Sequence, residues 1–153
     1  VFNDGQDFYV LFKSPVNGYL TIYLEVPSEQ MSYRILPYNS QKAKPSVKIN
    51  GDEEYIFFND KFNKLESTPS VDGLMLSLSN SNYAEQNALV VIFSTNEIAD
   101  KPLLQNNSIQ NNSQIPITPM SISINDFEEW ILKLKRKDEN VSSVKTFISI
   151  NPK

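Results

Sequence analysis

Two groups of clustered carboxylates are the side chains whose types best suit acid–base chemistry. One is the run at residues 52–54, Asp-Glu-Glu, and the other comprises Asp126, Glu128 and Glu129. A glycoside hydrolase needs two carboxylates that face each other across about 5 to 10 Å. The first group falls in a predicted turn and the second at a predicted helix start, where acidic side chains favour the helix dipole. We therefore expect neither group to be catalytic.

Histidine and cysteine are both absent from the sequence. This excludes a Ser-His-Asp triad, a cysteine nucleophile, a Cys/His zinc site and a disulfide. Any hydrolase built from this chain would depend on carboxylate, tyrosine or lysine. We predict that the protein is not an enzyme and that it uses no cofactor.

The segment Asn3-Asp4-Gly5-Gln6-Asp7 offers several oxygen ligands of the kind that Ca²⁺ prefers. It lacks the full spacing and the final glutamate of an EF-hand loop. We expect a polar turn before the first strand and no metal site.

Four tyrosines, Tyr19, Tyr23, Tyr33 and Tyr38, are the candidate ligand-binding residues. The first two share one face of a predicted strand, and the other two flank the turn that follows the next strand. Exposed aromatic rings on a sheet face can hold sugar rings. The simpler interpretation is that the tyrosines cover a half-buried sheet while their hydroxyls reach water. We expect the simpler arrangement and keep a glycan site as the alternative.

The strand that must position these tyrosines is predicted at residues 17–26. Its one side is entirely aliphatic, with Leu20, Ile22, Leu24 and Val26. Its other side carries Tyr19, Thr21, Tyr23 and Glu25. Such period-2 alternation indicates a strand with one apolar face, and a second layer must cover that face.

Seven further strands are predicted where short apolar runs lie between turn residues. They cover residues 7–13, 31–36, 47–49, 54–58, 74–78, 88–93 and 144–150. The first of them should form an antiparallel hairpin with residues 17–26, because the turn at residues 14–18, which ends in Asn17-Gly18, joins the two. Residues 88–93 are apolar throughout and should be covered on both faces. In the last strand, Val144, Ile148 and Ile150 should share one side.

One helix is predicted at residues 126–137, with Asn125 as its cap and Glu128 in the capping-box position. Its apolar stripe should pack on the sheet, and the stripe consists of Phe127, Trp130, Ile131 and Leu134. The basic end at residues 133–137 is explained by the helix dipole, without a lipid or nucleic-acid contact. A single helical turn is expected at residues 96–100.

Residues 105–114 consist almost entirely of Gln, Asn and Ser and predict a flexible loop. Asn106, Asn111 and Asn140 each begin an Asn-x-Ser sequon, which matters only if the source glycosylates such sites.

Length and charge bound the protein's class. A chain of 153 residues fits one domain, residues 1–153, and its net charge of −4 argues against nucleic acid as a partner. No apolar run approaches the roughly 20 residues that cross a bilayer. The chain begins at Val1, so we expect a mature or excised segment. The predicted fold is mainly β: a two-layer antiparallel β-sandwich, Ig-like or jelly-roll-like, with one C-terminal helix near 126–137.

Residues 14–39 carry a resemblance to a known family. A strand ending near Ser-Pro, the run Asn-Gly-Tyr-Leu-Thr-Ile-Tyr and a strand running into Ile-Leu-Pro-Tyr-Asn resemble the bacterial domain of unknown function 4384. Residues 47–58 and 88–102 are similar to its middle and late segments. Tyr38 separates Pro37 from Asn39, where the family has Pro-Asn. The resemblance implies a non-catalytic accessory module of envelope or signalling proteins, and it assigns no catalytic residue.

The sequence therefore favours a non-enzymatic accessory or protein-interaction module of a bacterial, envelope-associated protein. A protein is the expected partner. A carbohydrate-binding module that uses the tyrosines is the first alternative, and a carboxylate-dependent glycan hydrolase is the second.

Overall fold

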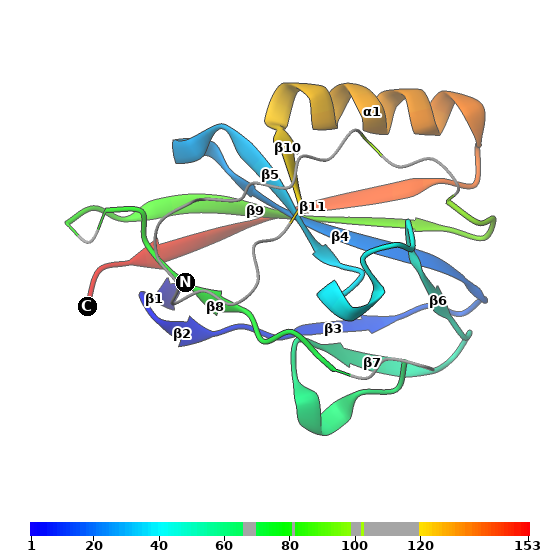
Figure 1. Ribbon diagram of the computed structural model, residues 1–153, viewed down its shortest axis with the longest axis horizontal. Helices are drawn as coiled ribbons and strands as arrows, with labels where there is room; N and C mark the ends of the chain where they lie inside the picture. The colour runs from blue at the N-terminus through cyan, green and yellow to red at the C-terminus, as the bar shows by residue number, and fades with distance from the viewer. Residues whose placement is uncertain (66–69, 81, 99–101, 103–119) are drawn as a thin grey trace.

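The computed structural model describes residues 1–65, 70–80, 82–98, 102 and 120–153. These residues form mainly β structure with one helix near the C-terminus, as predicted. Figure 1 shows three layers: helix α1 (Ile124–Lys137), one large sheet, and a lower layer of short strands. The lower layer and the large sheet form the expected sandwich.

The large sheet has seven strands in the order β1-β11-β9-β4-β5-β10, with β6 also paired to β4. Their bounds are β1 (Phe2–Asn3), β4 (Gly18–Val26), β5 (Met31–Leu36), β6 (Val47–Ile49), β9 (Glu85–Ser94), β10 (Ser121–Ser123) and β11 (Ser142–Asn151). All pairs are antiparallel except β1 with β11. The short 3₁₀ helices η1 (Pro27–Glu29), η2 (Asn39–Gln41) and η3 (Asp60–Phe62) lie in the connections.

Strand β4 is the centre of this sheet, since it pairs with β5, β6 and β9. It begins at Gly18, which the sequence placed in a turn. A Cβ atom on Gly18 would lie 2.3 Å from the Phe93 ring, so the close approach of β9 requires glycine there.

The lower layer consists of two small antiparallel sheets. One pairs β2 (Gln6–Asp7) with β8 (Met75–Leu76), and the other pairs β3 (Val10–Lys13) with β7 (Glu54–Phe57). The predicted hairpin between residues 7–13 and 17–26 is therefore wrong. The connection between β3 and β4 instead carries the chain from one layer to the other.

A second crossing, from β6 to β7, runs beside the first. The Asp52 amide donates to the Ser14 carbonyl at 2.7 Å, and the Gly51 amide donates to Asn17 Oδ1 at 2.7 Å. These bonds hold both crossings at the same end of the sandwich, which explains why the short turn does not close a hairpin.

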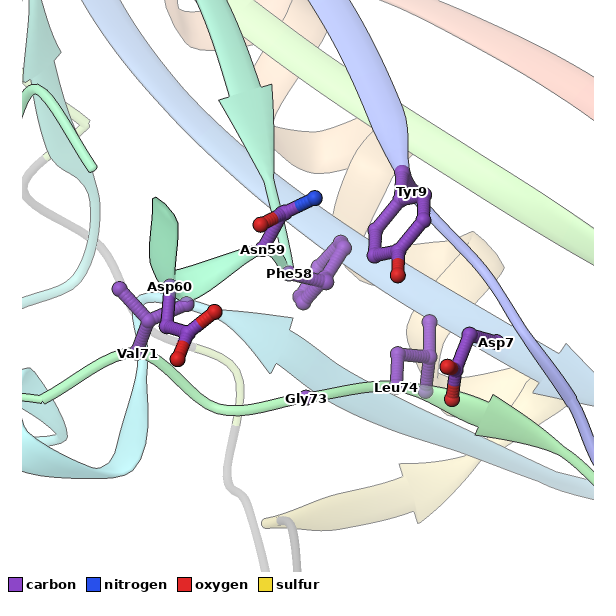
Figure 2. A pocket seen from close by; sticks show the side chains of 8 residues that line it. All are labelled: Asp7, Tyr9, Phe58, Asn59, Asp60, Val71, Gly73 and Leu74. Atoms are coloured by element: carbon purple, nitrogen blue, oxygen red, sulfur yellow. The ribbon is translucent and has the colours of Figure 1, made fainter. Parts of the chain in front are cut away.

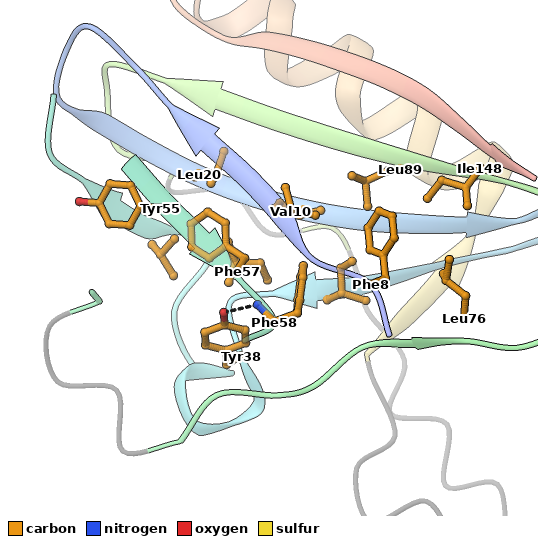
Figure 3. Close-up of a cluster of buried hydrophobic side chains, with 14 of the residues drawn as sticks. Phe8, Val10, Leu20, Tyr38, Tyr55, Phe57, Phe58, Leu76, Leu89 and Ile148 are labelled. Atoms are coloured by element: carbon orange, nitrogen blue, oxygen red, sulfur yellow. Dashed lines mark hydrogen bonds between the residues drawn. The ribbon is translucent and has the colours of Figure 1, made fainter. Parts of the chain in front are cut away.

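The main core lies between the two β layers, and Figure 3 shows part of it. Leu20 and Ile22 project into it from β4, as the alternation predicted, and they meet Phe57 from the lower layer. Leu89 on β9 and Ile148 on β11 extend the same core.

A second core lies between α1 and the other face of the large sheet. Phe127 and Leu134 are buried there, and Trp130 and Ile131 pack beside them, so the predicted stripe is confirmed. The helix begins earlier than predicted. Its cap is Ser123, whose Oγ accepts from the Asp126 amide at 3.2 Å, because Asn125 already lies inside the first turn.

Other strand predictions have mixed outcomes. Strand β9 is covered on both faces, as expected. The predicted strand at 74–78 is reduced to β8, and no helical turn forms at residues 96–98. Val144 is 62% exposed, unlike Ile148 and Ile150, because the lower layer does not cover that end of β11. The predicted loop at 105–114 lies outside the described residues, as do residues 99 and 100.

Candidate functional site

Two of the four candidate tyrosines are buried. Tyr23 is 1% exposed, and its ring centroid lies 4.3 Å from that of Phe127 because α1 covers this face of β4. Burial raises the pKa of Tyr23 above its usual range. Tyr38 is also 1% exposed. Neither ring can stack on a ligand, so an exposed face that includes them is contradicted.

The other two tyrosines are half-buried and lie apart. Tyr19 packs against the core under α1, whereas Tyr33 packs against the core between the β layers. The Tyr33 hydroxyl donates to the Glu29 carboxylate. Burial and this hydrogen bond raise the pKa of Tyr33. The four tyrosines therefore form no common binding surface.

The two carboxylate groups lie on opposite sides of the large sheet. Residues 52–54 lead into β7 in the lower layer, and Glu53 accepts a hydrogen bond from the Tyr55 hydroxyl at 3.1 Å. Asp126, Glu128 and Glu129 lie in the first turns of α1 on the upper side (Figure 1). The sheet separates the groups, so they cannot form the facing pair that glycan hydrolysis needs.

Residues 3–7 form the expected polar turn. Asp4 and Gly5 make the turn between β1 and β2, and Asp4 Oδ1 accepts from the Leu78 amide at 3.0 Å. The side chain of Gln6 accepts from the Asn3 amide at 3.1 Å. The Asp4 oxygen joins the N-terminus to the segment after β8, and the Gln6 oxygen closes the turn itself. Within the described ranges, no group of three acidic, histidine or cysteine side chains could hold a metal ion.

The basic residues and the Asn140 sequon that the sequence analysis singled out lie near the end of α1. Its basic residues at 133, 135, 136 and 137 are exposed. Asn140 lies in the turn that follows, and its side-chain amide donates to Asp138 Oδ1 at 3.1 Å. Asn106 and Asn111 lie outside the described residues.

A buried ionic group lies under α1, where the sequence indicated a partly exposed face. Glu25 on β4 is 2% exposed, and Lys145 Nζ on β11 lies 2.5 Å from its Oε2. Lys145 also approaches Glu128 Oε1 on α1 at 3.5 Å. The hydrogen bond to Glu25 raises the pKa of Lys145. This group joins the helix, the central strand and β11; its Glu25 carboxylate is buried, whereas the Lys145 side chain is 39% exposed.

Arg34 on β5 lies on the same side of the sheet and is also buried. Its guanidinium donates to the carbonyl oxygens of Lys42 at 2.7 Å and Lys44 at 3.3 Å. Burial lowers its pKa. Arg34 therefore anchors the loop after η2.

A surface pocket of about 250 Å³ opens in the lower layer. Figure 2 shows the residues that line it: Asp7, Tyr9, Phe58, Asn59, Asp60, Val71, Gly73 and Leu74. They come from three segments, which are the stretch between β2 and β3, the chain after β7, and the chain before β8. Sequence reasoning missed this site, since Tyr9 and Asp7 were assigned to one continuous strand.

The pocket forms where the chain at residues 6–13 changes its partner. The Phe8 amide donates to the Leu74 carbonyl at 2.8 Å, whereas Val10 pairs with Phe57 on β7. Beside Tyr9, these two partner segments diverge. Phe58 has a φ of 68°, a left-handed conformation that is costly for a bulky residue and that ends the β7 ladder. Its amide donates to the buried Tyr38 hydroxyl at 2.9 Å (Figure 3), and burial raises the pKa of Tyr38 to about 12.

A second open feature is the outer edge of β11. Strand β9 pairs with β11 on one side over residues 142–150, and β1 pairs on the other side only at Ile150 and Asn151. In the described part of the chain, no strand pairs with the outer edge over residues 142–149. Val144 and Phe147 on this stretch are 62% and 64% exposed. The edge therefore presents unpaired backbone groups flanked by two apolar side chains.

No helix among the described residues is long and apolar enough to span a membrane. No protein-family model matches the chain, no curated protein matches it in sequence, and no solved structure matches its fold.

Proposed function

We propose that the protein is a non-enzymatic interaction module that binds an extended segment of a partner protein along the outer edge of β11. The observation that carries this proposal is the open edge at residues 142–149, with Val144 and Phe147 exposed beside it. An extended peptide can add a strand to such an edge, where main-chain hydrogen bonds supply affinity and alternate side chains supply specificity.

The composition of β11 supports this use of its edge. Natural sheet edges are usually protected by short strands, proline, bulges or charged side chains, including charges that point inward. Strand β11 has ten residues, it contains no proline, and its one charged residue is Lys145. The strand therefore carries one of these protective features, the Lys145 charge that pairs with Glu25.

Val144 and Phe147 differ in sequence parity, so they project from opposite faces of the strand. An added strand would thus meet one apolar side chain on each face. This arrangement favours a partner strand that carries apolar residues on both of its faces near the middle of the contact.

The resemblance of residues 14–39 to the bacterial domain of unknown function 4384 agrees with this proposal, because that family is an accessory module. We extend the proposal to a bacterial, envelope-associated parent protein on the same ground. The carbohydrate-binding alternative loses its main support, since Tyr23 and Tyr38 are buried.

The test is photo-crosslinking in the source cells with a photoreactive phenylalanine analogue at position 147. The control places the same analogue at position 132 on α1, where leucine is also exposed. A single partner protein that crosslinks at 147 and not at 132 is expected. The purified partner should then lose binding to the double variant Val144→Lys, Phe147→Lys and keep binding to Leu132→Lys. Equal binding to both variants would contradict the proposal.

A further inference from the structure

We propose that the pocket beside Tyr9 binds a cationic group, either an ammonium or a guanidinium. This site lies in the lower layer, at a different place from the edge of β11 (Figure 1). It is therefore a second binding function, and it can hold whether or not the β11 proposal is correct.

The charge of the pocket is the first argument. Its lining contains the carboxylates of Asp7 and Asp60 and no lysine or arginine. Neither carboxylate forms an ion pair or accepts a hydrogen bond from any residue in the described ranges. Figure 2 shows Asp7 and Asp60 on opposite sides of the pocket. A cation between them would be attracted to both.

The aromatic wall is the second argument. Tyr9 is 48% exposed and lines the pocket together with the buried ring of Phe58. Figure 2 shows both rings between the two carboxylates. A cation near the face of an aromatic ring gains a further attraction, and the combination of acids with aromatic rings is typical of ammonium recognition.

The size of the pocket is the third argument. Its volume of about 250 Å³ lies below the range of about 300 to 1,000 Å³ that is typical of sites for drug-sized ligands. A basic side chain or a small amine fits this space better than an oligosaccharide does. A neutral sugar would also leave both carboxylate charges without a counterpart.

The pocket is held in shape by its surroundings. The hydrogen bond from the Phe58 amide to Tyr38 fixes the chain on one side, and the bond from the Phe8 amide to Leu74 fixes it on the other. Because these contacts are made within the protein itself, little conformational entropy should be lost on binding.

The test is an NMR titration of the ¹⁵N-labelled protein with n-butylammonium and n-butylguanidinium. The neutral isostere n-butanol and a neutral oligosaccharide are titrated in parallel. Saturable shifts of the Tyr9, Asn59, Gly73 and Leu74 amides are expected with the two cations only. The affinity should fall as the salt concentration rises, because the carboxylates are exposed.

Three variants sharpen this test. Asp7→Asn and Asp60→Asn should each weaken cation binding about fivefold, as expected for loss of one charge contact near 4 Å in water. Tyr9→Ala should weaken it about threefold through loss of the cation–π contact. The matched control Asp52→Asn removes an equal charge from a turn outside the pocket and should leave the affinity unchanged. Equal binding of butanol, or equal weakening by the control, would overturn the proposal.

A further titration distinguishes a basic side chain of a protein from a free small amine as the bound cation. A short blocked peptide that contains one lysine or arginine is compared with the free butyl cations. Tighter binding of the peptide assigns the pocket to a basic side chain of a protein, and weaker binding assigns it to a free amine. The absence of saturable shifts with the two butyl cations and with the peptide would overturn the cationic assignment.

Discussion

Helix α1 and the lower β layer cover opposite faces of the same large sheet, and they cover them differently. Under α1, some buried polar residues have partners: Thr21 Oγ1 donates to the Leu36 carbonyl at 2.8 Å, and Glu25 pairs with Lys145. Between the β layers the core is apolar, but the lower layer splits into two small sheets. The pocket lies at that split, and the edge of β11 extends beyond the lower layer. Regions of the large sheet that another layer covers completely supply stability. The proposed binding sites lie where a covering layer ends.

The largest expected effect lies in the apolar core. Leu20→Ala removes a fully buried side chain and should lower the free energy of unfolding by about 3 kcal/mol, because it leaves a cavity. Leu11 on β3 is exposed, so Leu11→Ala is the matched control and should cost less than about 0.5 kcal/mol. Urea denaturation of both variants measures the difference. Equal losses would mean that Leu20 is wrongly assigned to the core or Leu11 to the surface.

The buried ion pair under α1 gives the next effect. Glu25→Gln should cost about 2 kcal/mol, less than a fully buried pair would, since Lys145 can turn toward water. The same change at the exposed Glu128, Glu128→Gln, should cost less than about 0.5 kcal/mol. Chemical denaturation of the two variants compares them directly. A smaller loss for Glu25→Gln than for Glu128→Gln would show that α1 does not close this face.

Tyr38 links the core to the pocket, and its removal should have an intermediate effect. Tyr38→Phe leaves the buried Phe58 amide without an acceptor and should cost about 1.5 kcal/mol at neutral pH. Thermal unfolding at constant ionic strength measures this loss. A variant as stable as the native protein would show that the hydrogen bond does not hold Phe58.

The same tyrosine predicts a pH dependence. Its pKa is raised from 10.0 to about 12 in the folded state, so the folded state retains the phenol proton more tightly than the unfolded state. The resulting stability is fully present below about pH 10 and is lost as the pH rises toward 12. Tyr38→Phe should therefore lose less stability than the native protein over this interval. Parallel curves would contradict the raised pKa.

The smallest expected effect on stability lies at the edge of β11. Val144→Lys with Phe147→Lys should change the free energy of unfolding by less than about 0.5 kcal/mol, because both side chains are exposed. Circular dichroism during urea titration checks this expectation. A loss above 1 kcal/mol would mean that the two residues serve the core and not a partner.

Local patterns predicted the elements better than their pairing. Alternation located β4 and its apolar side, and the helical stripe of Phe127 and Leu134 located α1, since both patterns depend on neighbouring residues alone. The sequence patterns did not predict that the chain passes from the lower layer to the large sheet between β3 and β4. This crossing depends on hydrogen bonds from the distant turn at Gly51 and Asp52, which no local pattern records.

The candidate site was less predictable than the fold. Tyr23 and Glu25 were assigned to a half-exposed face because their side chains are polar, yet α1 and Lys145 bury them. The pocket at Tyr9 was not predicted, because it arises where two distant segments diverge from one strand. The open edge of β11 depends on which strand pairs last in the sheet, and sequence order does not give this.

The most direct test of the proposed function is amide hydrogen exchange of the protein with and without the partner that crosslinks at position 147. We predict that the partner slows exchange along residues 142–149 and leaves the exposed face of α1 unchanged. Main-chain hydrogen bonding to an added strand would cause this protection. Slowed exchange on α1, with residues 142–149 unchanged, would contradict the assignment of the β11 edge as the binding surface.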